Sequence, residues 1–146
     1  MSNKNIVSAL EKVLADSYFL YLKTQNYHWN VTGSNFKSLH ELFGSFYEEL
    51  SEAIDEIAER IRALGANAPG SFRAFSKLAT IEEEQKQNIS ADEMIKQLIK
   101  DHDHVLKTIR AALTVAQKAG DDATADMLIV RIEAHDKNKW MLQSSL

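Results

Sequence analysis

The chain has 146 residues, of which 45% are hydrophobic and 26% charged, a composition typical of one globular domain with a sizeable core. The absence of cysteine excludes disulfide bonds, thiolate metal sites and cysteine nucleophiles, and the five glycines and single proline are too few for a many-stranded β fold. The formal charge of -4 argues against a polyanionic partner. The sequence shows no signal-peptide core and no apolar run long enough to span a membrane, so we expect a cytoplasmic protein. We expect one domain over residues 1–146.

Apolar residues recur at three- and four-residue spacing in two consecutive segments, which predicts two long amphipathic helices. The first helix runs from about Asn5 to Asn30. The second runs from Phe36 to Leu64 and is ended by a glycine. Because the break between them is short, we expect the two helices to form an antiparallel hairpin.

A long connection follows Gly65 and begins with the richest stretch of helix breakers in the chain, which ends at Gly70. Within the connection, Phe72–Leu78 is predicted to form a short helix. Ser90 and Glu93 then form a capping box. The serine oxygen is expected to accept from the Glu93 amide, and the Glu93 carboxylate is expected to return to the serine amide.

Two further helical segments complete the chain. The third long helix runs from Ser90 to Lys118, and the fourth is capped by Asp121 or Asp122 and runs almost to Leu146. Short turns join the helices of each pair, and a long crossover joins the two pairs. This order predicts an all-α, ferritin-like four-helix bundle with a short helix in the middle connection.

Four side chains of types that bind metal ions lie on the first two helices: His28, His40, Asp55 and Glu59. Asp55 and Glu59 are four positions apart, which places both carboxylates on one face of a helix. His28 and His40 flank the turn, so the hairpin can bring their imidazoles together. Along the second helix, however, the carboxylates lie about 22 Å from His40. Each pair is therefore half of a site.

A two-fold axis near the middle of the second helix would place the histidines of one chain against the carboxylates of its mate. Gly44 and Ser51 are small enough to let two such helices approach closely. The four residues also have more ordinary explanations. Each histidine could be packed in the core or lie on the surface, and the two acids could lie on a solvated helix face with Arg60 as their partner. These explanations predict no relation between the two pairs, whereas the antiparallel arrangement brings all four ligands together. The pattern favours a metal site at a dimer interface.

These residues resemble the signature of the Dps proteins, the dodecameric mini-ferritins, and the resemblance runs along the whole chain. The matching segments are His28-Trp29-Asn30-Val31-x-Gly33-x-Asn35-Phe36, His40-Glu41, Asp55-x-x-Ala58-Glu59-Arg60, Asp126-Met127-Leu128, Asp136-Lys137 and Trp140. The resemblance implies a hollow shell of four-helix bundles, with a ferroxidase centre shared across each two-fold interface. His28 and His40 of one subunit, together with Asp55 and Glu59 of another, would be the catalytic ligands of Fe(II).

The resemblance also implies that hydrogen peroxide, or more slowly dioxygen, oxidises the iron, which is stored as ferric oxyhydroxide and so kept from damaging the cell. Trp29 would intercept stray one-electron oxidants beside the centre, or pack at the interface. Asp121, Asp122 and Asp126 would line three-fold pores that attract Fe(II), although acidic residues also stabilise a helix N-terminus.

One position departs from the family pattern. Many Dps proteins carry an aspartate four residues after the second histidine, and this chain has Gly44 there. A carboxylate is thereby lost from the second metal position of a two-iron centre. Antiparallel pairing places Glu52 of the partner subunit near the level of Gly44. Glu52 is then either the replacement ligand, directly or through water, or a surface acid.

DNA binding, which gave the family its name, is not expected here. Tail-dependent members use a flexible extension rich in lysine and arginine, whereas this chain has only Lys4 before the first helix and no basic residue in Gln143–Leu146. Two alternatives to an iron-storing ferroxidase still stand. One is a nucleoid-associated protein that compacts DNA, and the other is an oligomeric structural shell with lost ferroxidase chemistry, for which Gly44 is the argument.

The remaining cluster is Asp101-His102-Asp103-His104. Four consecutive residues fan around a helix, so they cannot converge on one ion. We interpret the cluster as a solvated face, with at most a contact to a neighbour such as His135.

Overall fold

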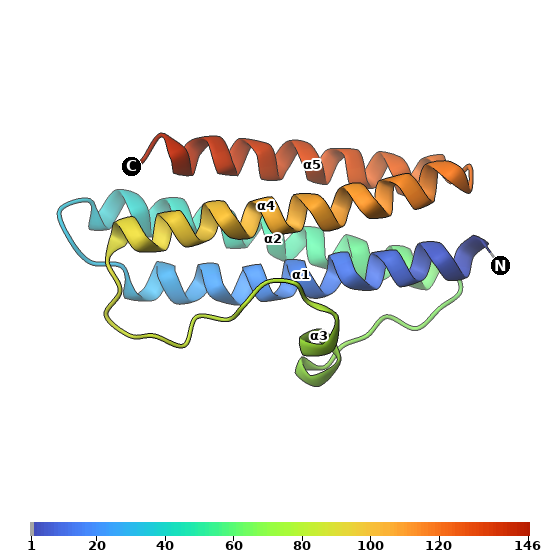
Figure 1. Ribbon diagram of the computed structural model, residues 1–146, viewed down its shortest axis with the longest axis horizontal. Coiled ribbons are helices and arrows are strands. Elements are labelled where there is room, and N and C mark those ends of the chain that lie inside the picture. Colours follow the sequence, from blue (N-terminus) through green and yellow to red (C-terminus); the bar gives the residue numbers. More distant parts are fainter. Residues whose placement is uncertain (1) are drawn as a thin grey trace.

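The computed structural model describes residues 2–146, which form five α-helices and no strand (Figure 1). The helices are α1 (Ser2–Asn30), α2 (Phe36–Ala63), α3 (Phe72–Leu78), α4 (Ala91–Lys118) and α5 (Asp122–Gln143). The predicted all-α fold is confirmed, including the short helix in the middle connection. Within the same range, none of the helices combines the length and apolar character that a bilayer crossing requires.

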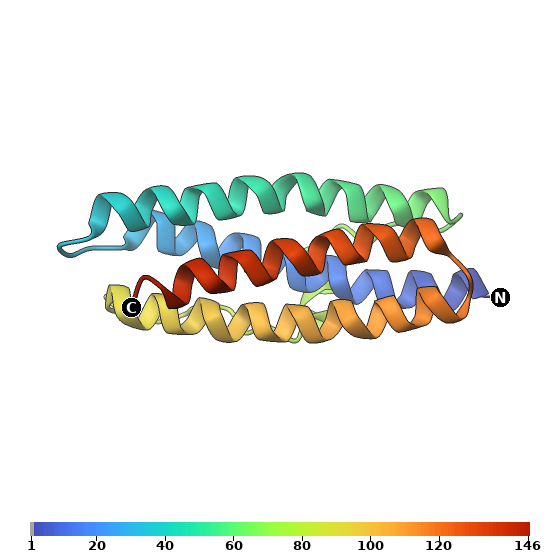
Figure 2. The same ribbon diagram turned by 90° about the horizontal axis from the view of Figure 1, so that it is seen from above.

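The four long helices lie side by side along the long axis of the molecule (Figure 1; Figure 2). α1 packs against α2 and α4, and α4 packs against α5. The α1–α2 turn and the start of α4 lie at one end of the bundle, whereas the end of α2 and the α4–α5 turn lie at the other. α2 and α4 therefore run parallel, and the connection between them spans the bundle. This is the crossover of the predicted ferritin-like topology.

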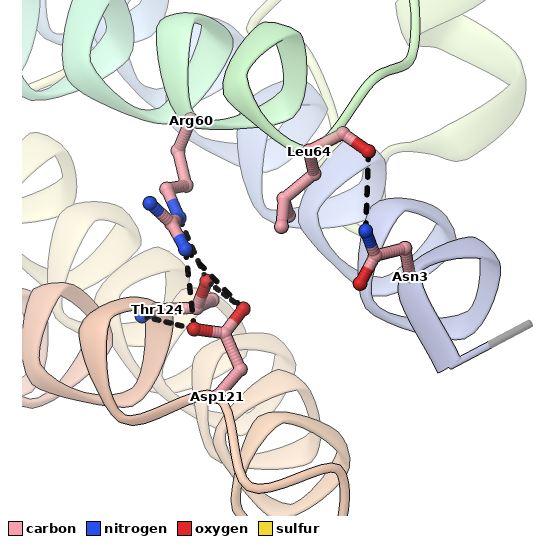
Figure 3. A network of polar contacts seen from close by, with 5 residues as sticks. All are labelled: Asn3, Arg60, Leu64, Asp121 and Thr124. Atoms are coloured by element: carbon pink, nitrogen blue, oxygen red, sulfur yellow. Dashed lines mark hydrogen bonds and ion pairs between the residues drawn. The ribbon is translucent and has the colours of Figure 1, made fainter.

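The first helix begins earlier than predicted, at Ser2 instead of Asn5. The side-chain amide of Asn3 donates a hydrogen bond of 3.3 Å to the carbonyl of Leu64, just beyond the end of α2 (Figure 3). This contact ties the first turn of α1 to a neighbouring helix. It is a tertiary interaction, so the periodicity of the segment does not reveal it. α5 ends at Gln143, slightly before the predicted end.

Polar side chains cap the two helices that follow the crossover. The Ser90 hydroxyl accepts from the Glu93 amide at 3.1 Å, as predicted for a capping box. The second half of that prediction is wrong, because the Glu93 carboxylate accepts from Gln97 one turn further along α4. At α5 the cap is Asp121, whose carboxylate accepts from the amide and the hydroxyl of Thr124.

A buried carboxylate on α1 anchors the crossover to the bundle. Asp16 is fully buried and accepts hydrogen bonds from the amide and hydroxyl of Thr80, at 2.5 and 2.7 Å. It also accepts from the Thr108 hydroxyl of α4 at 2.7 Å. A buried charge is tolerated only when it is hydrogen-bonded in this way. Asp16 therefore joins α1, α4 and the crossover at one point.

Two further residues of α1 hold the next part of the crossover. The Lys23 ammonium donates to the carbonyl of Glu82 at 2.9 Å and forms an ion pair with Asp101 of α4, also at 2.9 Å. The Tyr27 hydroxyl donates to the Glu84 carboxylate at 2.7 Å. Burial, together with this carboxylate, raises the pKa of Tyr27. The crossover is thus fixed along α1 and closes the bundle on that side.

The interpretation of Asp101-His102-Asp103-His104 as a solvated face is wrong for its first two residues. Asp101 is 3% exposed, and burial raises the pKa of its carboxyl although Lys23 opposes the shift. His102 is 2% exposed, and its Nδ1 lies 3.0 Å from Nδ1 of His135, which confirms the contact considered above. The physical reason is that α4 packs against both α1 and α5, so two of its faces are buried.

His102 and His135 form a neutral pair inside the bundle. The Arg131 guanidinium, itself paired with Glu49, donates to Nε2 of His135 at 3.3 Å. The proton of His135 is therefore on Nδ1, directed at His102. Burial, with Arg131 nearby, lowers the pKa of His102 to about 4. Burial, the neighbouring His102 and Arg131 hold the pKa of His135 well below its ordinary value.

We predict that acid destabilises the fold through these two histidines. Because their folded pKa values lie below the ordinary 6.5, the unfolded chain binds more protons as the pH falls from 6.5 toward 4. The free energy of unfolding should decrease over this range by up to about 1.4 kcal/mol per pH unit for each histidine. Urea unfolding curves measured across the range test this. The double variant His102→Leu/His135→Leu should show a shallower decrease, and an unchanged slope would contradict the prediction.

Candidate metal centre

His28, in the last turn of α1, and His40, in the second turn of α2, face each other across the hairpin. Their imidazole rings stack with centroids 3.8 Å apart and planes inclined by 14°. Nδ1 of His28 donates to the carbonyl of His40 at 2.5 Å, and Nδ1 of His40 donates to the carbonyl of His28 at 2.6 Å. The hairpin therefore holds the two imidazoles in contact through a reciprocal pair of hydrogen bonds.

These hydrogen bonds decide which nitrogen of each ring is available. A carbonyl can only accept, so Nδ1 of each ring carries a proton, and Nε2 is the nitrogen whose lone pair can bind a metal ion. Metal-binding histidines are held in the same manner, with one ring nitrogen bonded to an oxygen and the other free for the ion. The bond from His40 also satisfies the carbonyl of His28, which lies among the last carbonyls of α1 that have no partner within the helix. The pair thus offers two nitrogen ligands in a fixed orientation.

Gly44 makes room for this arrangement. A Cβ atom at this position would lie 3.0 Å from Cε1 and 3.2 Å from Nδ1 of His28. A side chain at position 44 therefore competes for space with the hydrogen bond between His28 and His40. Gly44 is buried beneath the His28 ring of its own chain. It offers no free surface to a second helix backbone, contrary to the role expected of it from the sequence.

Asp55 and Glu59 lie on the exposed side of α2. The neighbouring Arg60 is directed elsewhere, because its guanidinium donates to the Thr124 hydroxyl at 2.9 Å and to the Asp121 carboxylate at 3.1 Å (Figure 3). The alternative in which Arg60 neutralises Asp55 and Glu59 is therefore wrong. Among the ion pairs of residues 2–146, none involves either carboxylate.

The histidine pair and the carboxylate pair do not meet within the chain. His40 and Asp55 lie on one continuous helix, and their separation along its axis is about 22 Å. Over residues 2–146, no three histidine or acidic side chains converge where a metal ion could bind. Two ligands are too few, because protein-bound divalent metals take four or more. Glu52, which is exposed one turn before Asp55, belongs to the carboxylate half.

The acidic residues at the start of α5 differ in their surroundings. Partial burial acts to raise the pKa of Asp121, but the hydrogen bonds from Thr124 and the Arg60 guanidinium hold it below its usual range. Asp121 thus caps α5 and also forms an ion pair with Arg60. Asp122 and Asp126 are exposed and lie one turn apart on α5.

Aromatic side chains surround the histidine pair. Phe36 stacks on His40, and Tyr47 meets His28 edge-on, each with a centroid distance of 5.2 Å. Trp29 is 60% exposed and lines a surface cleft of about 1020 Å³ between α1 and the crossover. Tyr47 was not predicted from the sequence. Its position one turn after Gly44, on the same helix, is the signal that points to it.

Known proteins share this fold. Residues 7–146 match the family model described as a ferritin-like domain. An uncharacterized low temperature-induced protein of Nostoc is 40% identical over 145 residues, which are 97% of this chain and 79% of that protein. DNA protection during starvation protein 2 of Bacillus anthracis is 33% identical over 144 residues, 99% of this chain and 98% of that protein. The crystal structure of a Dps protein from Vibrio cholerae O1, described as a member of the ferritin-like diiron-carboxylate superfamily, is similar with a TM-score of 0.93. It is 32% identical, over 98% of this chain and 89% of that one.

We predict that Gly44→Ala disturbs the histidine pair. The added methyl group would lie too close to the His28 ring, so the ring must move and its hydrogen bond to His40 must lengthen. Imidazole nitrogen NMR signals of His28 and His40 should shift, while those of the distant His102 and its partner should not. Ser45→Ala, at the exposed neighbouring position, is the matched control. Unchanged His28 signals in Gly44→Ala would show that the glycine is not required.

Proposed function

Because the chain belongs to the Dps branch of the ferritin-like family, we propose that it stores iron and is a ferroxidase that oxidises Fe(II) with hydrogen peroxide. Iron storage is the general function that the family supports. The ferroxidase chemistry rests on the residues of this chain. His28 and His40 of one subunit and Asp55 and Glu59 of another would bind Fe(II), which is both substrate and cargo.

The observation that carries this proposal is the division of one ligand set into two complementary halves. The histidine half has both Nδ1 atoms bonded to carbonyls, which leaves the Nε2 lone pairs for a metal. The carboxylate half is exposed, and the nearby Arg60 is paired with Asp121 instead. Imidazole and carboxylate without thiolate is a ligand set that suits iron or manganese. Neither half is sufficient alone, whereas the two together make a four-ligand site.

We infer that the two halves meet in a homo-oligomer, in the dodecameric shell that the family resemblance implies. Antiparallel pairing of two α2 helices about their midpoint would bring the halves together twice, once on each side of the axis. Large apolar side chains are exposed around the cleft beside the histidines: Leu22, Trp29, Phe36 and Phe72. Exposed apolar surface of this kind is typical of a protein interface. A second copy that covers it would carry its carboxylates toward the histidine pair.

The chemistry follows from the ligands. Anionic oxygen ligands stabilise Fe(III) relative to Fe(II), and the imidazoles hold the geometry. Two Fe(II) ions and two protons reduce one hydrogen peroxide to two waters, so no hydroxyl radical is released. The ferric product would then mineralise inside the shell as an oxyhydroxide. Dioxygen would serve as a slower oxidant.

Three further residues have accessory roles in this proposal. Exposed Trp29, next to His28 in the chain, would intercept one-electron oxidants that leave the centre. Asp122 and Asp126 would attract Fe(II) to a pore of the shell. Asp121 would contribute less to such a pore, because it caps α5 and pairs with Arg60.

The proposal predicts that two inactive variants complement each other. His28→Ala/His40→Ala and Asp55→Ala/Glu59→Ala should each lose rapid peroxide-driven formation of Fe(III), measured by stopped-flow absorbance after anaerobic loading with Fe(II). When the two variants are unfolded and reassembled together in equal amounts, half of the two-fold pairs are mixed, and one site in each mixed pair is intact. About a quarter of the wild-type rate should return.

The matched control for this experiment is each variant reassembled alone, with its oligomeric size checked by gel filtration. Recovery only in the mixture means that each site takes ligands from two subunits. If the wild type and both variants oxidise Fe(II) at the same slow rate, the shell is a scaffold or carries a different metal. If both variants keep the full wild-type rate, oxidation takes place elsewhere and these four residues are not the site. If they are inactive and the mixture recovers nothing, the ligands are not shared in the proposed way.

We further propose that Glu52 of the partner subunit supplies, directly or through water, the carboxylate that Gly44 lacks. The variant Glu52→Ala should then bind about half as much Fe(II) per subunit as the wild type, because one of two metal positions loses its oxygen ligand. Anaerobic Fe(II) titration measures the stoichiometry. Glu56→Ala, which removes another exposed acid on the next turn of α2, is the control. Unchanged binding and oxidation in Glu52→Ala would leave Glu52 as a surface acid.

A further inference from the structure

A continuous row of aromatic rings leads away from the histidine pair. Tyr47 of α2 meets His28 at a centroid distance of 5.2 Å, and Tyr21 of α1 meets Tyr47 at 5.9 Å. Tyr18, one turn earlier on α1, lies 5.7 Å from Tyr21 and stacks on Phe75 of α3 at 5.1 Å. Each step is within the range of direct aromatic contact. Three of the chain's four tyrosines therefore form one path that begins at a proposed iron ligand.

The other oxidisable rings near the centre are not part of this path. Tyr27 is fully buried beside Phe43, and its hydroxyl is committed to the Glu84 carboxylate of the crossover. Trp29 is next to His28 in sequence, but it is largely exposed, and within residues 2–146 it makes no ring contact with either imidazole. Tyr47, in contrast, is half-buried and in direct contact with the His28 ring.

The absence of a carboxylate at position 44 suggests a role for this row of rings in supplying electrons to the centre. Hydrogen peroxide requires two electrons, and a centre that holds one Fe(II) supplies one. With no carboxylate at position 44, the second metal position lacks a ligand from its own chain. Centres that hold one Fe(II) instead of two are therefore expected, even if Glu52 helps to fill the second position. One Fe(II) acting alone would release a hydroxyl radical, whereas a second electron from the protein completes the reduction of peroxide to water. The phenol in direct contact with a proposed iron ligand is Tyr47.

We propose that Tyr47, backed by Tyr21 and Tyr18, donates the second electron to peroxide when the centre holds a single Fe(II). This inference rests on the proposed ferroxidase function. In the balanced reaction, Fe(II), the tyrosine phenol, hydrogen peroxide and one solvent proton give Fe(III), a tyrosyl radical and two waters. The O–O bond breaks, one electron comes from iron and one from the phenol, and the phenol proton ends in water. The radical then moves along the row from Tyr47 toward Tyr18, away from the metal.

The test is rapid-freeze electron paramagnetic resonance of the assembled protein, loaded anaerobically with one Fe(II) per subunit and mixed with hydrogen peroxide. Ferric absorbance and peroxide consumption are followed on the same samples. The wild type should give a tyrosyl signal and consume close to one peroxide per Fe(II). Tyr47→Phe keeps the ring and loses the phenol, so the tyrosyl signal should disappear. Tyr27→Phe is the matched control and should keep the tyrosyl signal, because the Tyr27 hydroxyl is committed to Glu84 outside the row.

The outcomes separate this inference from the function on which it rests. A wild type that forms Fe(III) rapidly but gives no tyrosyl signal overturns the role of Tyr47 and leaves the ferroxidase intact. A tyrosyl signal that persists in Tyr47→Phe, or that is lost in Tyr27→Phe, assigns the radical elsewhere and also overturns it. Failure of the wild type to form Fe(III) overturns the ferroxidase proposal, and the tyrosine relay with it. In the variant Tyr21→Phe the tyrosyl signal should still form at Tyr47. It should decay sooner, because without the Tyr21 phenol the radical cannot move away from the metal.

Discussion

The unbroken length of α2 keeps the two halves of the candidate metal centre apart. The helix has 28 residues, and its backbone hydrogen bonds fix the distance between any two of them. His40 near one end cannot approach Asp55 and Glu59 toward the other. A function that needs both groups therefore requires a second copy of the chain, and the same rigidity makes the position of each half predictable in an assembly. A flexible linker between the halves would permit a site within one chain but would hold it less well.

In the hairpin between α1 and α2, the lack of a side chain at position 44 allows a hydrogen bond between His28 and His40. At Gly44 the helix presents bare backbone, and His28 uses the space to reach the carbonyl of His40. The two imidazoles then fix each other's tautomers without help from a carboxylate. In the proposed centre, the glycine also means that position 44 offers no oxygen ligand. Gly44 therefore bears on both the packing of the histidine pair and the number of ligands in the proposed centre.

α1 serves two functions on two faces. Its buried polar residues, Asp16 and Lys23, anchor the crossover and so complete the ferritin-like topology. Its aromatic residues Tyr18 and Tyr21 link the histidine end of the bundle to the short helix α3 through Tyr47. The polar contacts hold the crossover over this helix, and the crossover holds the α3 ring that ends the aromatic row. Stability and the proposed redox path therefore depend on the same packing.

The five helices and their order could be predicted from the amino-acid sequence, because helical periodicity and caps are local properties that do not depend on neighbouring helices. It also identified His28, His40, Asp55 and Glu59 as candidate ligands, since residue type and spacing along a helix are read directly from the chain. The packing of the helices was needed to identify the partner of Arg60, the burial of His102 and the contact between Gly44 and His28. Each of these depends on which helices pack against each other. The hydrophobic periodicity of a single helix does not show which helix packs on it. The row of tyrosines escaped prediction for the same reason, because its steps cross between α1 and α2.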